Sequence, residues 1–104
     1  MTTITTDEVK IRLDAGEAIN LVDVREPAEH AEFNIGGTLL PLGKIQTMQT
    51  DDIDELKNAE VICYCRSGNR SAKALVMMRE LGFRNVYEVG GGISLSSRLV
   101  KGGG

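Results

Sequence analysis

The stretch EVICYCRSGNRSAKALVMMRELG, residues 60–82, places a strand, a short polar loop and a helix in immediate succession. The continuous apolar run 61–65 predicts a buried strand, because it offers no polar residues for a solvent-facing side. Gly82 is expected to end the helix that follows, and Ser71 is expected to cap its start. Its core-facing residues are expected to be Leu75, Met78 and Leu81. A strand that leads directly into a helix is typical of an α/β domain.

The chain before this stretch shows the same alternation. Residues 5–16 predict a helix that Gly16 ends in a left-handed conformation. Thr5 and Glu8 have the spacing of a capping box at the start of this helix. The apolar run 19–24 predicts a second buried strand, which favours a sheet whose strands are mainly parallel.

The remaining segments are shorter. Pro27 fits the first position of a further helix. A backbone N–H at that position has no acceptor within the helix, so the lack of an N–H in proline costs nothing there. Glycines and a proline in 34–45 predict a loop with a short strand around Leu39 and Leu40. Thr50 is expected to cap a short helix. The chain then continues with a predicted strand at 84–89 and a predicted last helix at 93–100.

Composition narrows the class of protein. The 104 residues, 41% of them hydrophobic and 26% charged, predict one globular domain over 1–104 with a flexible glycine tail at 101–104. A net charge of -3 and four aromatic residues do not favour binding to nucleic acid or to an anionic membrane. The sequence lacks an apolar run that could span a bilayer and begins without the pattern of a secretory signal. A cytoplasmic protein is therefore expected.

Cys65 ends the predicted strand and is followed at once by small, polar and cationic residues. Open parallel sheets bind their ligands at this edge. The loop N–H groups and the N-terminus of the next helix are expected to form an anion-binding site, to which Arg66 and Arg70 add positive charge. Such surroundings favour a thiolate, which is a nucleophile that needs no general base. Cys65 is therefore the candidate nucleophile.

Other candidate residues are less favoured. Cys63 lies inside the apolar run and is better explained as a core residue than as a resolving thiol. His30 is the single histidine and lies in another element, which disfavours a Cys-His-Asn arrangement with Cys65. Two cysteines and one histidine at these spacings do not form a zinc site, so no metal or cofactor is expected. Arg70 points either outward or back toward an acid such as Asp23.

Three segments resemble the rhodanese-like sulfurtransferase family. CRSGNRS at 65–71 is similar to the active-site loop of that family, and LVDVREPAE at 21–29 is similar to its Asp-Val-Arg-Glu segment. NVYEVGGGI at 85–93 is similar to its strand and Gly-Gly turn. Asn34 stands where the family often has histidine, and the tryptophan common after the turn is missing. The resemblance covers essentially the whole chain and implies a central parallel sheet of about five strands flanked by helices.

The resemblance also implies roles for individual residues. Cys65 would accept a sulfane sulfur as a persulfide, while Asp23 and Arg25 would support the loop from the neighbouring strand end. The residues implied in substrate binding are Arg66, Ser67, Gly68, Asn69, Arg70 and Ser71. Four residues separate Cys65 from Arg70, whereas related phosphatases have a longer loop. A tighter ring of amides suits a single sulfur atom better than a phosphate group.

The favoured hypothesis is therefore a thiosulfate sulfurtransferase that passes sulfur from a donor such as thiosulfate to a thiol or to cyanide. The alternative is a persulfide carrier or redox-sensing interaction module with little turnover of small donors. A phosphatase or arsenate reductase is disfavoured by the short loop, and a non-catalytic domain by the presence of Cys65. The expected partners are a small sulfur donor and a thiol acceptor, including thioredoxin-like or cysteine desulfurase proteins, with no nucleic acid and no membrane.

Overall fold

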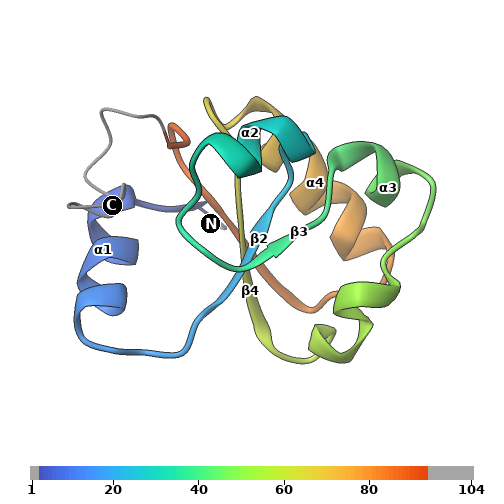
Figure 1. Ribbon diagram of the computed structural model, residues 1–104. Helices are drawn as coiled ribbons and strands as arrows, with labels where there is room; N and C mark the ends of the chain where they lie inside the picture. The colour runs from blue at the N-terminus through green and yellow to red at the C-terminus, as the bar shows by residue number, and fades with distance from the viewer. Residues whose placement is uncertain (1–2, 94–104) are drawn as a thin grey trace.

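The computed structural model describes residues 3–93, which form an α/β domain around one sheet. The strands are β1 (Thr3–Ile4), β2 (Asn20–Asp23), β3 (Thr38–Leu39), β4 (Glu60–Tyr64) and β5 (Asn85–Val89). Their order across the sheet is β1-β5-β4-β2-β3, and every neighbouring pair is parallel (Figure 1). The helices are α1 (Thr6–Asp14), α2 (Pro27–Glu32), α3 (Leu42–Gln46), α4 (Asn69–Glu80) and the 3-10 helix η1 (Asp51–Leu56). The predicted α/β fold with a parallel sheet is confirmed.

β4 lies in the middle of the sheet and is buried on both faces. Alternate side chains of a strand point to opposite faces, so Val61 and Cys63 pack on one side and Ile62 and Tyr64 on the other. The first face is covered by α3, η1 and α4, which contribute Ile45, Ile53, Ala74, Leu75 and Met78. The second face is covered by α1, which lies on the opposite side of the sheet in Figure 1. This two-sided burial explains the continuous apolar run in the sequence.

The predicted start and end of α1 and the predicted start of α2 are confirmed. Thr5 caps α1 by accepting the Glu8 N–H at 3.1 Å, and Glu8 accepts the Thr5 N–H at 3.4 Å in return. Gly16 has a φ of +80° just beyond the helix end. Pro27 is the first residue of α2, as predicted. These local signals are reliable because they depend on neighbours in the sequence and not on tertiary contacts.

The segment 34–45 contains more regular structure than predicted. The expected short strand is present as β3, but α3 follows it where only a loop was expected. Pro41 occupies the N-cap position of α3, and Ile45 is the buried residue that anchors the helix in the core. A five-residue helix is too short to show a periodic apolar pattern. Gly43 inside it is also a residue that disfavours helix, so the local composition does not predict one.

The predicted cap at Thr50 is wrong. Thr50 precedes η1, but its hydroxyl donates to the Asp54 carboxylate at 2.8 Å and caps no backbone N–H.

The two ends of the chain differ from the prediction or lie outside it. β1 has two residues, too few to be predicted, and is held by its pairing with β5. The predicted helix 93–100 lies outside the described residues except for Ile93. Within residues 3–93, no helix has the length and apolarity needed to cross a membrane.

The start of α4 also differs from the prediction. The helix begins at Asn69, and Gly68, with a φ of +93°, occupies the N-cap position three residues before the predicted cap at Ser71. Ser71 therefore lies in the first turn and does not cap the helix. The left-handed glycine turns the chain sharply enough to begin the helix inside the polar loop. The first helical residues are polar, so the apolar pattern of the sequence does not indicate that they belong to the helix. Gly82 follows the helix end with a φ of +103°, as predicted.

Removing the buried side chain of Ile62 should cost much of the stability of the domain. Ile62 is 0% exposed in the central strand, and truncation there would leave a cavity that neighbouring strands cannot fill. We expect Ile62→Ala to lower the free energy of unfolding by about 2–5 kcal/mol in urea titrations.

Ile11→Ala is the matched control, because the same atoms are removed from a side chain that is 67% exposed. This change should alter the free energy of unfolding by less than about 0.5 kcal/mol. Equal losses in the two variants would contradict the assignment of the core.

Candidate active site

Cys65 directly follows β4 at the carboxyl edge of the sheet and is completely buried. Its Sγ accepts the backbone N–H of Gly68 at 3.0 Å and that of Ser71 at 3.4 Å. Both N–H groups lie at the N-terminus of α4, where the aligned peptide dipoles give a positive end. The loop therefore surrounds the sulfur with fixed donors that stabilise a negative charge on it.

The glycine turn after β5 supports this loop from beside it. The Ile93 N–H donates to the Cys65 carbonyl at 2.8 Å. Gly92 has a φ of +70°, and a Cβ at this position would overlap the carbonyl group of Arg66 and approach the Cys65 carbonyl oxygen at 2.6 Å. The backbone of the turn and that of the loop are in contact, so this position requires glycine.

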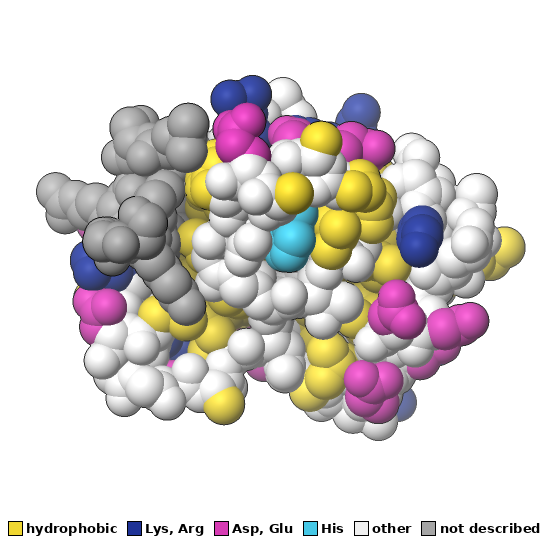
Figure 2. Space-filling model, viewed as in Figure 1, with side chains coloured by type: hydrophobic (Ala, Val, Ile, Leu, Met, Phe, Trp, Pro, Cys, Tyr) yellow, Lys and Arg dark blue, Asp and Glu magenta, His cyan; other side chains and the backbone are white. Residues whose placement is uncertain are grey.

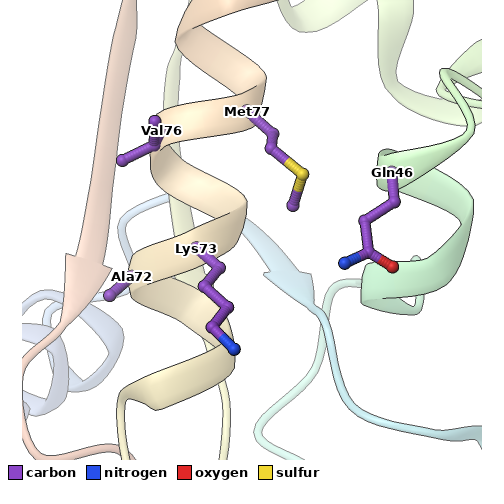
Figure 3. Close-up of a pocket in the computed structure, with 5 residues that line it drawn as sticks. All are labelled: Gln46, Ala72, Lys73, Val76 and Met77. Carbon is purple, nitrogen blue, oxygen red and sulfur yellow. The ribbon is translucent and has the colours of Figure 1, made fainter.

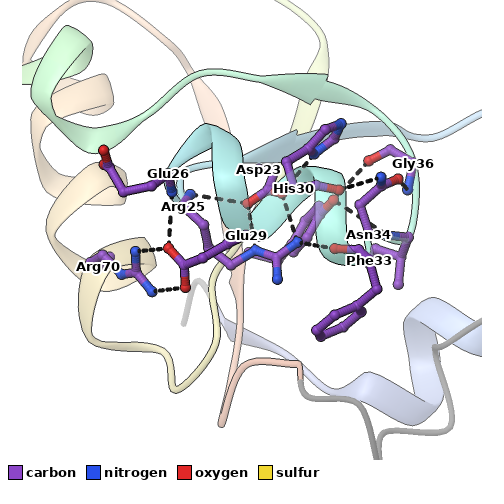
Figure 4. Close-up of polar contacts among 11 residues, drawn as sticks. Asp23, Arg25, Glu26, Glu29, His30, Phe33, Asn34, Gly36 and Arg70 are labelled. Carbon is purple, nitrogen blue, oxygen red and sulfur yellow. Dashed lines mark hydrogen bonds and ion pairs between the residues drawn. The ribbon is translucent and has the colours of Figure 1, made fainter.

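Arg70 is paired with an acidic side chain of α2. Its Nη1 and Nη2 donate to the two carboxylate oxygens of Glu29 at 2.6 and 2.8 Å (Figure 4). The sequence left open an outward orientation or a contact with an acid such as Asp23, and the acid is instead Glu29 of α2. The hydrogen bond from Arg70 lowers the pKa of Glu29 to about 2. This bidentate pair ties the first turn of α4 to α2.

Arg66 remains the loop arginine with an exposed guanidinium. Within residues 3–93 its side chain makes no hydrogen bond or ion pair. It borders a small hollow of about 80 Å³ whose other lining residues are Arg25, Glu29, Glu32 and Phe33. An unpaired guanidinium at the rim of such a hollow can bind an oxyanion.

Asp23 and Arg25 form a buried ion pair near the end of β2. The Arg25 Nε donates to Asp23 Oδ1 at 2.9 Å and its Nη2 to Oδ2 at 2.8 Å, with both side chains at most 1% exposed. Burial alone would raise the pKa of Asp23, but the hydrogen bonds from Arg25 and His30 outweigh it and leave the pKa lowered. The guanidinium also packs over the rings of Phe33 and Tyr64 at 4.9 and 5.5 Å from their centroids.

Within residues 3–93, this ion pair makes no hydrogen bond to the loop 65–71. Asp23 makes its side-chain hydrogen bonds to Arg25 and His30, and within the described residues none of them reaches 65–71. The His30 Nδ1 lies 2.8 Å from Asp23 Oδ2, and the ring, cyan in Figure 2, reaches the surface with 24% of the side chain exposed. Direct contact between α2 and the loop is made by Glu29.

Cys63 belongs to the core, as predicted. It is 0% exposed, and its S–H donates to the sulfur of Met78 on α4 at 3.3 Å. Burial raises the pKa of the Cys63 thiol to about 12. The two cysteines therefore differ in their surroundings, because among residues 3–93 backbone N–H groups donate to the sulfur of Cys65 and not to that of Cys63.

Two carboxylates of the site were missed in the sequence. Glu29 pairs with Arg70, and Glu88 of β5 accepts the Ser71 hydroxyl at 3.0 Å and the Thr3 hydroxyl at 3.1 Å. Glu88 lies opposite Cys63 in the register of β4 and β5. An acid between the apolar residues Tyr87 and Val89 interrupts the apolar pattern of the predicted strand, and that interruption is the signal that the sequence offers.

A second hollow lies between α3 and α4 (Figure 3). Its volume is about 420 Å³, and it is lined by Gln46, Ala72, Lys73, Val76 and Met77. These lining residues include no thiol, hydroxyl or acid, so the candidate chemistry lies in the loop. Among residues 3–93, no three histidine, cysteine or acidic side chains group as metal ligands.

Adding a methyl group at Gly92 should disrupt the loop around Cys65. We expect Gly92→Ala to lose more than about 3 kcal/mol of unfolding free energy, because a strained φ and an overlap with the Arg66 carbonyl add together. Gly91→Ala is the control, since Gly91 has a φ of +80° but no atom within 4 Å of the position that a Cβ would take. It should lose about 1–2 kcal/mol in the same denaturant titration. Equal losses would show that the two backbones are not in contact.

The Glu29–Arg70 pair should stabilise the domain in a pH-dependent way. A folded-state pKa of about 2 lies below the ordinary value of 4.5, so folding favours the ionised carboxylate. The contribution is complete above about pH 4.5 and is lost as the pH falls toward 2. We expect the difference in unfolding free energy between the wild type and Glu29→Gln to be constant from pH 5 to 7 and to shrink toward zero by pH 2. A difference that is unchanged across this range would contradict the ion pair.

Comparison with known proteins agrees with this geometry. The family model of the rhodanese-like domain matches residues 5–97. The putative sulfurtransferase YtwF of Bacillus subtilis (strain 168) is 37% identical over 90 residues, which are 85% of this chain and 84% of that protein. The putative sulfur carrier protein YrkF of the same strain is 33% identical over 87 residues, or 83% of this chain. The chain spans 45% of the length of YrkF.

Solved structures show the same fold. The crystal structure of a rhodanese-like domain protein from Staphylococcus aureus has a TM-score of 0.80 and 29% sequence identity, and the match covers 97% of both chains. The parallel sheet, the loop after β4 and the match to the family model over nearly all of the chain lead to one assignment. This chain belongs to the rhodanese-like domain family.

Proposed function

We propose that this protein is a sulfurtransferase that carries a sulfane sulfur as a persulfide on Cys65. The observation that carries the proposal is the position of Sγ, which accepts two backbone N–H groups at the positive end of α4. These donors favour an anionic sulfur before the reaction and an anionic persulfide after it. The family membership and the similarity to YtwF, a protein named as a putative sulfurtransferase, support the same chemistry.

Thiosulfate serves as the example of a donor. The Cys65 thiolate attacks the outer sulfur of thiosulfate and forms a new S–S bond, while the bond between that sulfur and the sulfonate sulfur breaks. The bonding electrons leave with sulfite, and Cys65 keeps the transferred sulfur as a persulfide anion. Because Cys65 is buried, part of its surroundings must move for the donor to reach Sγ.

Arg66 is the residue that we assign to the departing sulfite. Its guanidinium is exposed beside the small hollow and is free of acidic partners within residues 3–93. Arg70 holds its charge against Glu29 and so shapes the loop without binding the leaving group. In this respect the proposal differs from the simple expectation that both arginines bind the anion.

The second half of the reaction returns Cys65 to its starting state. An acceptor thiolate, or cyanide in an assay, attacks the outer sulfur of the persulfide and takes it away as a new persulfide or as thiocyanate. The Cys65 thiolate leaves into the same set of backbone donors. Donor and acceptor therefore react in turn at one atom, as in a ping-pong scheme.

A second candidate function is a persulfide carrier that receives sulfur from a cysteine desulfurase and delivers it to a thioredoxin-like or other protein thiol. The similarity to YrkF, a protein named as a putative sulfur carrier, favours this candidate. The chemistry at Cys65 is the same in both functions. They differ in whether a small donor or a partner protein reaches the buried thiol at a useful rate.

Sulfur loading should be visible directly in the intact mass of the protein. After incubation with thiosulfate, we expect the wild type and Cys63→Ala to gain the mass of one sulfur atom, which cyanide or a thiol reductant then removes. Cys65→Ala should gain nothing, because Cys63 is buried and no backbone N–H of the described part of the chain donates to its sulfur. Cys63→Ala is the matched control, since it removes the other thiol of the chain.

The other outcomes separate the candidates. Loading of Cys65→Ala to the wild-type level would contradict the assignment of the nucleophile. Loading of Cys65 by a desulfurase and its substrate, with none from thiosulfate, would support the carrier over the transferase. No loading from either source would contradict sulfur transfer as the function.

A further inference from the structure

Cys65, Ser71 and Glu88 form a continuous chain of hydrogen bonds that the sulfur chemistry above does not use. The Cys65 S–H lies 3.5 Å from Ser71 Oγ, and the Ser71 hydroxyl lies 3.0 Å from Glu88 Oε1. Cys65 and Ser71 are both 0% exposed, so water does not replace either partner. The three residues come from the end of β4, the first turn of α4 and β5, which only the fold brings together.

The direction of these hydrogen bonds follows from the number of protons available. The Ser71 hydroxyl has one proton, which can go to Glu88 or to the Gly68 carbonyl oxygen at 3.2 Å. A carboxylate is the stronger acceptor. With its proton directed to Glu88, the Ser71 oxygen presents lone pairs to Cys65 and accepts the S–H. This is the arrangement in which a base acts on a nucleophile through an intermediate hydroxyl.

We propose that Glu88 is a positioning residue that accepts, through Ser71, the proton released when Cys65 ionises. The S–H proton moves to Ser71 Oγ as the Ser71 hydroxyl proton moves to Glu88 Oε1. The electron pair of the S–H bond stays on Sγ, and Glu88 becomes neutral, so no outside base is needed. Ser71 then donates to the thiolate together with the two backbone N–H groups already in place.

Electrostatics make this transfer more favourable than ionisation beside a charged Glu88. A thiolate formed beside a charged Glu88 would place two negative charges close together, whereas the double transfer moves one charge from Glu88 to Cys65. Within the described residues, the groups that face this chain are Cys63 from β4, Arg70 from α4 and the Thr3 hydroxyl from β1. Arg70 is the cation among them, and Glu29 already neutralises it.

The inference deepens the proposed function, on which it rests for the role of Cys65 as the reacting thiol. Its test uses alkylation by iodoacetamide, which reports thiolate reactivity without any sulfur donor. All proteins carry Cys63→Ala, so that modification counted by intact mass comes from Cys65 alone. Rates are measured from pH 5 to 10 for the parent, Glu88→Gln, Ser71→Ala and the combination of both changes.

The parent should show a plateau at neutral pH, because Cys65 and Glu88 share one negative charge whose distribution does not depend on pH. In Glu88→Gln the rate at pH 6 should fall by at least about tenfold and should rise about tenfold per pH unit, as for an isolated thiol. Ser71→Ala should give the same profile, and combining the two changes should cause no further loss, since both break one chain. Near pH 10 the variants should react as fast as the parent or faster.

Two controls separate this role from structural ones. Thr3→Val removes the other hydrogen bond of Glu88, and Glu80→Gln makes the same charge change at the exposed end of α4. Both should keep the parent profile. Glu88→Gln reacting at pH 6 as fast as the parent, or faster, would overturn the proposal, because a passive negative charge suppresses ionisation. A plateau that survives in Ser71→Ala would also overturn the proposal. This variant tests the hydrogen-bond chain even if Glu88→Gln fails to fold. If the alkylation profiles are as expected but Cys65 gains no sulfur, the proposed sulfurtransferase function is contradicted and the hydrogen-bond chain from Cys65 to Glu88 is not.

Discussion

The parallel pairing of β4 with β2 and β5 is the constraint on which the candidate site depends. In a parallel sheet the carboxyl ends of all strands lie at one edge, so the segments that follow them meet there. The segment after β4 contains Cys65, that after β2 leads to Glu29, and that after β5 contains Gly92. Segments far apart in the chain thereby enclose one sulfur atom, and each of them contacts the loop.

Three acidic side chains hold the surroundings of this loop. Asp23 fixes Arg25, Glu29 fixes Arg70, and Glu88 fixes Ser71. Arg25 and Arg70 are therefore already neutralised, and their charge contributes to the shape of the site. The stabilisation of an anionic sulfur depends mainly on backbone N–H groups and the N-terminus of α4, which are rigid and cost no reorganisation when charge develops.

Rigid donors around a buried sulfur suit a reaction in which a single atom is transferred. The backbone N–H of Gly68 approaches Sγ at 3.0 Å, so the ring of donors is closely fitted to the sulfur itself. Arg66, at the rim, is the charge positioned for a larger oxyanion to leave. The hydroxyl of Ser71 connects this arrangement to Glu88, which adds a proton acceptor where the sequence had indicated that none was needed.

Local sequence patterns are sufficient to predict the fold class and the main strands and helices, and they single out Cys65 as the candidate nucleophile. These follow from signals between near neighbours, such as the apolar run of β4, the capping box at Thr5 and the polar loop directly after Cys65. Short elements escaped prediction because β1 and α3 have too few residues for a periodic pattern. Sequence patterns predict the start of α4 too late, because the helix begins after Gly68, among polar residues that are typical of a loop.

Which side chains meet at the site becomes known from the folded chain and not from its sequence patterns. Arg70 contacts Glu29 and not Asp23, and Ser71 joins Cys65 to Glu88 where it had been expected to cap a helix. Such contacts depend on the order of strands in the sheet and on the path of the crossovers between them. A sequence pattern records which face of its own element a residue occupies, but contains no distance to a residue on another strand, and that distance determines hydrogen bonds, charge and reactivity.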